Sequence, residues 1–482
     1  MSLKLKAIIL ACTLFVALLS VDLADVRAAP NTSKIKLEPC VLAGSVSAEC
    51  GTLRVYEDRL THRGRQIDLR VAVLRARSKD VLPDPIFFFA GGPGVPATAD
   101  ALSVANIFLN ARQHRDVVLV DQRGTGGSHE LLCPTPDPVK YAELGEGYLP
   151  VYVKDCLATL DGDPRFYTTA MAMDDVDEVR AALGYDQINI YGGSYGATAV
   201  QVYLRLHEDH VRSAVVAFGT LLDIPIFERV AHSSQLALDN LFERCKQDIL
   251  CHATFPDLEQ EFATLMQRLK NKPISSKTLK TADGQPIMVN DLTFAGAVHN
   301  LLLYVVDAVK LPRLIHRAYT LDDVDSLLTS VPSGSIAQTL VMSAVIRCSE
   351  PWAAYRPDNI KKIGDSYLNE VQIQNALEQQ KICDLLPDPG AAAAYPPPAK
   401  SDVPVLILTG GADPQNPPQN MEGYEQLWSN SLWVIFPNQG HNISASSCYP
   451  NLLSRFIEQG SGQELDVSCA RYLSVSTFDI TS

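Results

Sequence analysis

Residues 188–197 read Ile188-Asn189-Ile190-Tyr191-Gly192-Gly193-Ser194-Tyr195-Gly196-Ala197 and contain the single Gly-x-Ser-x-Gly sequence of the chain. A β-branched apolar run precedes the serine, and a helix-compatible segment, Ala197–His207, follows it. This order predicts a strand, a sharp turn and a helix, with Ser194 at the apex. The turn is too tight for Cβ atoms on either side, so glycines flank the serine and its hydroxyl lies exposed above the sheet. We therefore interpret Ser194 as a candidate nucleophile.

Eight strand-like runs surround this motif, and they predict an α/β fold. Two runs alternate apolar with polar residues, which is typical of antiparallel strands with one solvated face. The other six are short and continuously apolar, as buried parallel strands are, and helical segments such as Met173–Leu183 alternate with them. The expected sheet is doubly wound, mostly parallel and eight-stranded. Its strands are expected at Thr52–Glu57, Ile67–Arg75, Ile86–Phe89, Val117–Val120, Ile188–Tyr191, Ala214–Phe218, Val405–Leu408 and Trp433–Phe436.

The spacing of these strands predicts an insertion. Nearly two hundred residues with helical character separate Ala214–Phe218 from Val405–Leu408, and they end in a Pro/Ala-rich stretch, Pro387–Pro404, with the composition of a linker. We expect a signal peptide at 1–29, a first core part at 30–223, a helical cap at 224–400 and a second core part at 401–482.

The first residues have the pattern of an export signal. Lys4 and Lys6 precede an apolar run, 7–19, and small residues follow at Ala28 and Ala29. The run is too short to span a bilayer, which takes about 20 residues. We expect a cleaved signal, a periplasmic or extracellular protein and no stable membrane association. The net charge of −14, without a basic patch, argues against nucleic acid as a partner.

Ten cysteines remain outside the expected signal, an even number that suits an oxidising compartment and predicts five disulfides. Metal binding is the rival interpretation, but no Cys-x-x-Cys pair or His/Cys cluster with ligand spacing occurs, so we expect no metal. The sequence does not determine the connectivity. Pairing of nearest neighbours is the simplest arrangement: Cys40–Cys50, Cys133–Cys156, Cys245–Cys251, Cys348–Cys383 and Cys448–Cys469.

A nucleophilic serine needs a histidine as base and an acid that orients the histidine. Asp413 directly follows the run Val405–Leu408, and His441 follows the last run, so both come in the chain order expected for this fold. Asp413 before Pro414 also suits an Asx turn, and His441 also suits an ordinary loop histidine. Three strand-end loops together favour a Ser194–His441–Asp413 triad.

A second glycine cluster, Gly91-Gly92-Pro93-Gly94, follows the run Ile86–Phe89. Acyl transfer needs N–H donors aimed at the developing oxyanion, and we expect the backbone N–H groups of Gly92 and Tyr195 in that role. A plain strand-to-loop turn is the alternative. No phosphate-binding glycine pattern is present, and the expected chemistry requires no cofactor. A third run, Asp121–Ser128, is interpreted as a buried Arg–Asp network that supports neighbouring loops.

Taken together, Gly91–Gly94, Asp121–Ser128, Gly192–Gly196, Gly411–Pro414 and Gly440-His441 resemble the proline iminopeptidase and tripeptidyl-aminopeptidase group of α/β hydrolases. The resemblance covers about residues 50–220 and 400–450. It implies the α/β-hydrolase fold with a helical cap, and serine exopeptidase activity on peptides with a free amino terminus. Prolyl members have histidine where this chain has Ala90, so the resemblance leans toward the exported tripeptidyl-type branch.

Such an enzyme must hold a substrate ammonium, which requires a carboxylate in a partly dry pocket. The stretch around Cys348 and Glu350 resembles the Cys-x-Glu segment of the tripeptidyl-type relatives, so Glu350 is the candidate amine anchor. Glu228 is a second candidate, and a surface glutamate is the alternative for Glu350.

The hypothesis is therefore an exported serine exopeptidase that releases single residues, such as proline, or tripeptides through an acyl-enzyme. Two alternatives stay open. The same residues serve a carboxylester or lactone hydrolase or an acyltransferase, and the fold also occurs in catalytically inactive binding modules.

Overall fold

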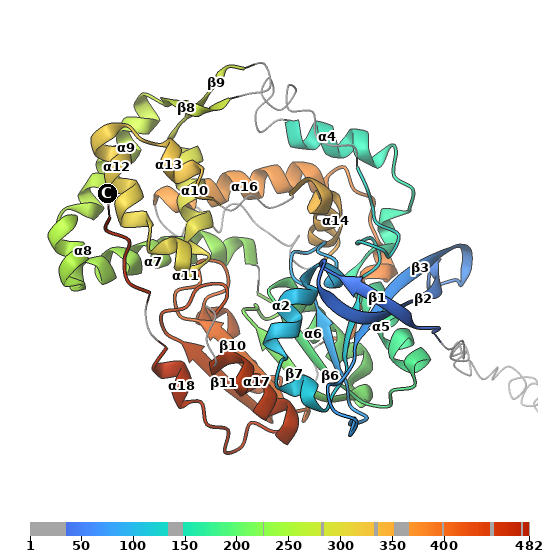
Figure 1. Ribbon diagram of the computed structural model, residues 1–482. Coiled ribbons are helices and arrows are strands. Elements are labelled where there is room, and N and C mark those ends of the chain that lie inside the picture. Colours follow the sequence, from blue (N-terminus) through green and yellow to red (C-terminus); the bar gives the residue numbers. More distant parts are fainter. Residues whose placement is uncertain are drawn as a thin grey trace, which may run out of the picture. The chain divides into compact units, whose positions relative to one another are not determined.

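A nine-stranded, mostly parallel sheet, most of whose strands are labelled in Figure 1, has the order β1-β2-β3-β5-β4-β6-β7-β10-β11. The first three strands pair antiparallel with their neighbours, and every pair from β5 onward is parallel. The strands are β1 Glu38–Leu42, β2 Val46–Asp58, β3 Arg63–Leu74, β4 Ile86–Phe89, β5 Val117–Val120, β6 Ile188–Gly193, β7 Val211–Ala217, β10 Val405–Gly410 and β11 Ser431–Phe436.

The predicted fold class is confirmed, with one correction. The sheet has nine strands rather than eight because Glu38–Leu42 forms an additional strand, β1, along β2. This segment is only five residues long and carries a proline, so its own pattern is a weak indication of a strand. Proline is tolerated in an edge strand, where its missing N–H is not needed by a second neighbour. Tertiary pairing with β2, together with the Cys40–Cys50 disulfide, holds it there.

The computed structural model describes residues 35–133, 148–224, 226–280, 284–331, 336–350, 366–397, 400–443, 448–473 and 476–481. The expected signal peptide, 1–29, lies outside these residues. Within them, no helix has both the length and the apolar character needed to cross a membrane.

Helices cover both faces of the sheet, as the doubly wound prediction requires. One apolar layer packs strand residues such as Val71 and Phe87 against α5 (Thr169–Leu183) and α6 (Tyr195–His207). The apolar layer on the opposite face packs the adjacent strand residues, such as Ala72 and Ile86, against α2 (Ala101–Ile107) and α17 (Cys448–Gln459). The alternation follows from the two-residue period of a strand, which sends consecutive side chains to opposite faces.

Between β7 and β10 lies a mostly helical segment, residues 226–383, with an apolar core of its own. A short hairpin, β8–β9, interrupts its helices. The helix α4 (Tyr148–Leu157), which precedes this segment in the chain, packs against α16. The elements are α7 Ile226–Gln247, α8 Ile249–Thr254, α9 Leu258–Asn271, β8 Ile274–Lys280, β9 Pro286–Val289, α10 Asp291–Leu302, α11 Val305–Ala308, α12 Leu311–Leu321, α13 Asp325–Leu328, α14 Ile336–Ser349 and α16 Tyr367–Cys383.

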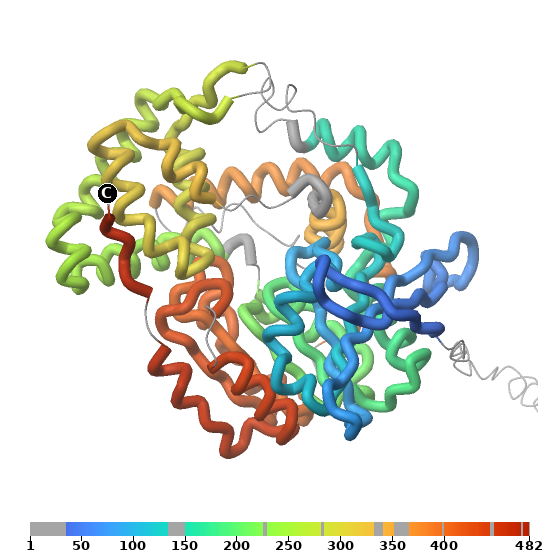
Figure 2. Tube along the Cα trace, in the orientation of Figure 1, coloured from blue at the N-terminus to red at the C-terminus, as the bar shows by residue number. Residues whose placement is uncertain are grey.

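The last described residues, 476–481, run from the sheet unit along the helical segment (Figure 2). Phe478 and Ile480 pack against the apolar core of that segment, and Asp479 pairs with Arg313 at 2.9 Å. The Arg244 guanidinium lies 5.2 Å from the centre of the Phe478 ring, a cation–π contact. These contacts attach residues 476–481, which follow β11 and α18 (Ser468–Arg471) in the chain, to the helical segment.

Ten cysteines form five disulfides in the structure, each joining nearest neighbours in the chain: Cys40–Cys50, Cys133–Cys156, Cys245–Cys251, Cys348–Cys383 and Cys448–Cys469. The Cys348–Cys383 bridge joins the end of α14 to the end of α16, two residues from Glu350.

Candidate active site

Ser194 lies in a strained turn between β6 and α6. Its backbone has φ 57° and ψ −123°, a conformation that side-chain-bearing residues rarely adopt. The close approach of the two elements explains the neighbouring glycines. A Cβ on Gly192 would lie 2.0 Å from the carbonyl oxygen of Gly196, and one on Gly196 would lie 2.2 Å from that of Phe89. The tight packing leaves the Ser194 side chain at the carboxyl end of the sheet.

The structure brings Ser194, His441 and Asp413 into one hydrogen-bonded chain. His441 Nε2 lies 2.9 Å from Ser194 Oγ, and His441 Nδ1 lies 2.8 Å from Asp413 Oδ2. Burial disfavours the imidazolium, but the charge of Asp413 and its hydrogen bond together raise the pKa of His441 above its ordinary value. A more basic imidazole takes a proton from a serine hydroxyl more readily.

Asp413 combines the two roles that its sequence context suggested. Its Oδ1 accepts from the backbone N–H groups of Gln415 and Asn416, at 2.8 and 2.9 Å, which is an Asx turn. Its Oδ2 is left for His441, and the residue is only 2% exposed. The turn fixes the carboxylate plane, so one oxygen points at the histidine.

The glycine loop after β4 lies against the serine. A Cβ on Gly91 would lie 3.3 Å from the carbonyl oxygen of Gly193 and 3.5 Å from the Cβ of Ser194. Gly92 has φ +113°, which favours glycine. Tyr195 opens α6 directly after the serine. The structure therefore brings the backbone of this loop next to Ser194, as an oxyanion loop requires.

The run after β5 supports this loop and its surroundings. Asp121 is fully buried and accepts hydrogen bonds from the Thr98 backbone and hydroxyl and from the Gly127 N–H. Thr98 follows the glycine loop closely in the chain. Arg123, also fully buried, donates to both carboxylate oxygens of Asp175 and to main-chain carbonyls. Asp121 thus holds the segment after the glycine loop, and Arg123 holds α5 and the end of β2, rather than each other.

Glu350 is buried, with 4% of its surface exposed, and it is connected to the residue after the nucleophile. Its Oε1 accepts from the Thr169 N–H, the first residue of α5, at 2.9 Å. The Thr169 hydroxyl lies 2.8 Å from the Tyr195 hydroxyl. Among the described residues, Glu350 Oε2 has no hydrogen-bond partner. Burial raises the pKa of Glu350 to about 7, against the lowering effect of the Thr169 N–H.

Two parts of this arrangement escaped sequence reasoning. No motif marks Thr169. Gln122, whose Oε1 lies 3.2 Å from the Tyr195 hydroxyl, belongs to the run Asp121–Ser128, but its contact with Tyr195 was not expected. The apolar face of α14, with residues such as Met342 and Ile346, packs with Tyr195 in one cluster and so brings Glu350 to this region. The side chain of Glu228, the second candidate anchor, lies outside the described part of the chain.

One group of the described residues has the composition of a metal site, namely Asp177, His207 and His210. His210 Nδ1 lies 2.7 Å from Asp177, and Arg180 lies 3.3 Å from His210 Nε2. Arginine can only donate, so Nε2 accepts and Nδ1 carries the proton toward Asp177. The nitrogen that would face a metal is therefore protonated. The geometry favours a hydrogen-bonded link between α5 and the end of α6.

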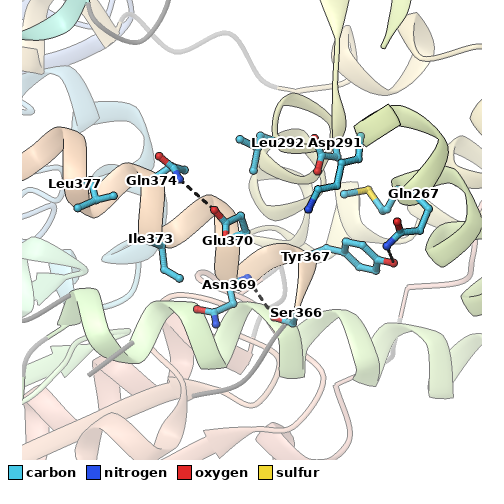
Figure 3. A pocket seen from close by; sticks show the side chains of 12 residues that line it. Gln267, Asp291, Leu292, Ser366, Tyr367, Asn369, Glu370, Ile373, Gln374 and Leu377 are labelled. Carbon is cyan, nitrogen blue, oxygen red and sulfur yellow. Dashed lines mark hydrogen bonds between the residues drawn. The ribbon is translucent and has the colours of Figure 1, made fainter. Parts of the chain in front are cut away.

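A pocket of about 700 Å³ opens between α9, α10 and α16 (Figure 3). Apolar residues such as Leu292 and Ile373 line it together with Asp291 and Glu370, and Glu370 accepts a hydrogen bond from Gln374. None of Ser194, Asp413, His441 or Glu350 lines it. This pocket is therefore separate from the candidate active site.

Residues 84–298 match the family model described as "alpha/beta hydrolase fold", and residues 369–469 match that of "TAP-like protein". The chain is 29% identical over 212 residues to tripeptidyl aminopeptidase of Streptomyces lividans, covering 40% of this chain and 39% of that protein. It is 26% identical over 132 residues to proline iminopeptidase of Neisseria gonorrhoeae, covering 27% and 31%. The alignments thus span well under half of either relative.

Among solved structures, proline iminopeptidase of Mycobacterium smegmatis aligns with a TM-score of 0.42 and 15% identity, over 85% of this chain and 98% of that one.

Proposed function

This chain belongs to the α/β hydrolases that include the tripeptidyl aminopeptidases and proline iminopeptidases, and from that premise we propose that it is a serine exopeptidase. It releases single residues or tripeptides from the free amino terminus of peptides. The proposal includes export through the N-terminal signal, and five disulfides support an oxidising compartment. It also includes a cap role for the helical segment, which restricts access to Ser194.

In the proposed mechanism, Ser194 attacks the scissile carbonyl while His441 takes its proton and Asp413 orients the imidazole. The backbone N–H groups of Gly92 and Tyr195 stabilise the oxyanion. His441 then donates the proton to the leaving amine, and water hydrolyses the acyl-enzyme by the reverse sequence. The hydrogen-bonded chain from Ser194 to Asp413 supports this assignment.

The observation that carries the exopeptidase proposal is the buried carboxylate of Glu350. One oxygen is held by the Thr169 N–H, and the other has no partner among the described residues. An ammonium group supplies the charge and the donors that this oxygen lacks. A buried carboxylate beside a nucleophile elbow is costly unless it binds a cation, so a free amino terminus is the ligand that it fits.

The test compares tripeptidyl- and aminoacyl-arylamides with the same compounds acetylated on the amine, and with short acyl esters. The proposal requires hydrolysis of the free-amine arylamides, strong loss on acetylation, and no activity in Ser194→Ala. Equal rates with blocked and free amines would leave an esterase-type hydrolase as the better description. A peptide-library digest read by mass spectrometry then gives the length of the released product.

A further inference from the structure

The helical segment contacts both loops that carry the acid and the histidine (Figure 1). Leu303, directly after α10, accepts a hydrogen bond at 2.7 Å from the backbone N–H of His441 itself. The approach is close enough that a Cβ on Gly440 would lie 2.4 Å from the same carbonyl oxygen. A residue of the helical segment thus fixes the backbone position of His441, which itself follows the last strand of the sheet.

The acid loop is held from a second helix. Ser233 in α7 donates from Oγ to the carbonyl oxygen of Pro414 at 2.7 Å, and Pro414 is the residue that follows Asp413. The neighbouring Ser234 Oγ lies 3.4 Å from the same oxygen. Ser233 is buried, so water does not replace its hydrogen bond to Pro414 readily.

His299 in α10 links the two helices, α7 and α10, that make or adjoin these contacts. Its Nδ1 lies 3.0 Å from Ser234 Oγ, and that hydroxyl also lies 2.6 Å from the carbonyl oxygen of Val230. A carbonyl can only accept, so the single hydroxyl proton of Ser234 goes to Val230 and His299 donates from Nδ1. The ionisable groups that act on His299 are Asp413 and His441. Burial lowers the pKa of His299 to about 4, so the imidazole is neutral near pH 7.

We propose that α7 and α10 hold Asp413 and His441 at hydrogen-bonding distance from each other, with His299, Ser234 and Ser233 as positioning residues. The triad is then assembled only while these helices sit against the two loops, so the helical segment is part of the catalytic framework as well as a barrier to access. This inference rests on the proposed serine mechanism.

The test compares His299→Leu, which removes the donor, with His299→Asn, whose amide nitrogen occupies the place of Nδ1 and keeps it. His316→Leu is the matched control, because His316 in α12 is also bonded through Nδ1, to Glu261, but within the helical segment. Each is assayed for Ser194 labelling by a fluorophosphonate probe and for hydrolysis of a short acyl ester between pH 4 and 9. The small ester removes peptide recognition from the comparison.

For His299→Leu we expect kcat to fall by about 10²-fold with KM little changed, as for a catalytic group displaced by about 1 Å. The acid limb of the pH profile should move to lower pH, because a loosened Asp413 contact no longer raises the pKa of His441 as far. His299→Asn should keep kcat and the acid-limb midpoint near their wild-type values, and the control His316→Leu should change neither quantity. If His299→Leu does not fold, Ser234→Ala removes the same hydrogen bond with a smaller change.

If His299→Leu hydrolyses the ester at the wild-type rate, with the wild-type midpoint of the acid limb and normal labelling of Ser194, this inference is wrong and the proposed function still stands. Absence of labelling at Ser194 in the wild type would overturn the proposed function and this inference with it.

Discussion

Replacing Glu350 with glutamine should stabilise the protein above neutral pH and at the same time impair binding of a free amino terminus. The folded-state pKa of about 7 lies above the ordinary value of 4.5, so the folded protein holds its proton more tightly than the unfolded chain does. Below pH 4.5 Glu350 is protonated in both the folded and the unfolded state, so its burial carries no penalty in the free energy of unfolding. Between pH 4.5 and 7 stability falls, and above pH 7 the full penalty applies.

The size of this penalty follows from the pKa difference of about 2.5 units between 7 and 4.5. At about 1.4 kcal/mol per unit it amounts to roughly 3 kcal/mol. Glutamine has the same shape, carries no charge, and keeps an oxygen that accepts from the Thr169 N–H. We expect Glu350→Gln to exceed the wild type by up to about 3 kcal/mol in the free energy of unfolding at pH 8, with no gain from charge removal at pH 4.5 or below.

Urea unfolding at pH 4.5 and pH 8 measures this difference. The matched control is Glu57→Gln, because Glu57 is similarly buried but has partners for both oxygens: the Tyr167 hydroxyl and the Asp163 N–H on one, Arg65 on the other. Its substitution should destabilise the protein at pH 8. A Glu350→Gln protein no more stable than the wild type at pH 8 would refute the desolvation argument.

The same variant tests the role of Glu350. Hydrogen bonds to charged groups contribute about 1.5–3 kcal/mol, so kcat/KM for free-amine arylamides should fall by about 10- to 100-fold, while that for short acyl esters stays unchanged. In the wild type, kcat/KM for free-amine substrates should fall more steeply below pH 7 than kcat/KM for short acyl esters, because Glu350 takes up its proton there in addition to His441. Unimpaired use of free-amine substrates by Glu350→Gln would refute its assignment as the amine anchor.

Three further changes test the other parts of the site. Asp413→Asn keeps the shape of the acid but favours the wrong tautomer of His441, so kcat should fall by about 10⁴-fold; near-normal fluorophosphonate labelling would contradict the triad. Gly196→Ala places a Cβ 2.2 Å from the Phe89 carbonyl and should abolish both esterase and arylamidase activity; retained activity would show that the elbow can relax. Phe478→Ala removes the ring that packs on the helical segment and on Arg244 and should lower the free energy of unfolding by about 1–3 kcal/mol. Thermal unfolding measures this loss, and an unchanged midpoint would show that residues 476–481 do not hold the helical segment.

Most of the fold could be predicted from local sequence patterns. Each of the eight expected runs corresponds to a strand. Six are continuously apolar, as buried parallel strands require, and two alternate, as antiparallel strands with one solvated face do. The order of Ser194, Asp413 and His441 along the chain was equally informative, since the carboxyl ends of parallel strands meet at one edge of the sheet. The additional strand β1 was missed because it is short and carries a proline, and pairing with β2 holds it in the sheet.

The sequence by itself determined the elbow, the sheet and the three strand-end loops, because each depends on neighbours within a few residues. Only the tertiary structure brought Glu350 to the first turn of α5 and Leu303 to the N–H of His441. These contacts join segments more than a hundred residues apart, and no periodicity records such a contact. The burial that sets the pKa of Glu350 and His299 is likewise a property of packed layers, which a single stretch of sequence does not encode.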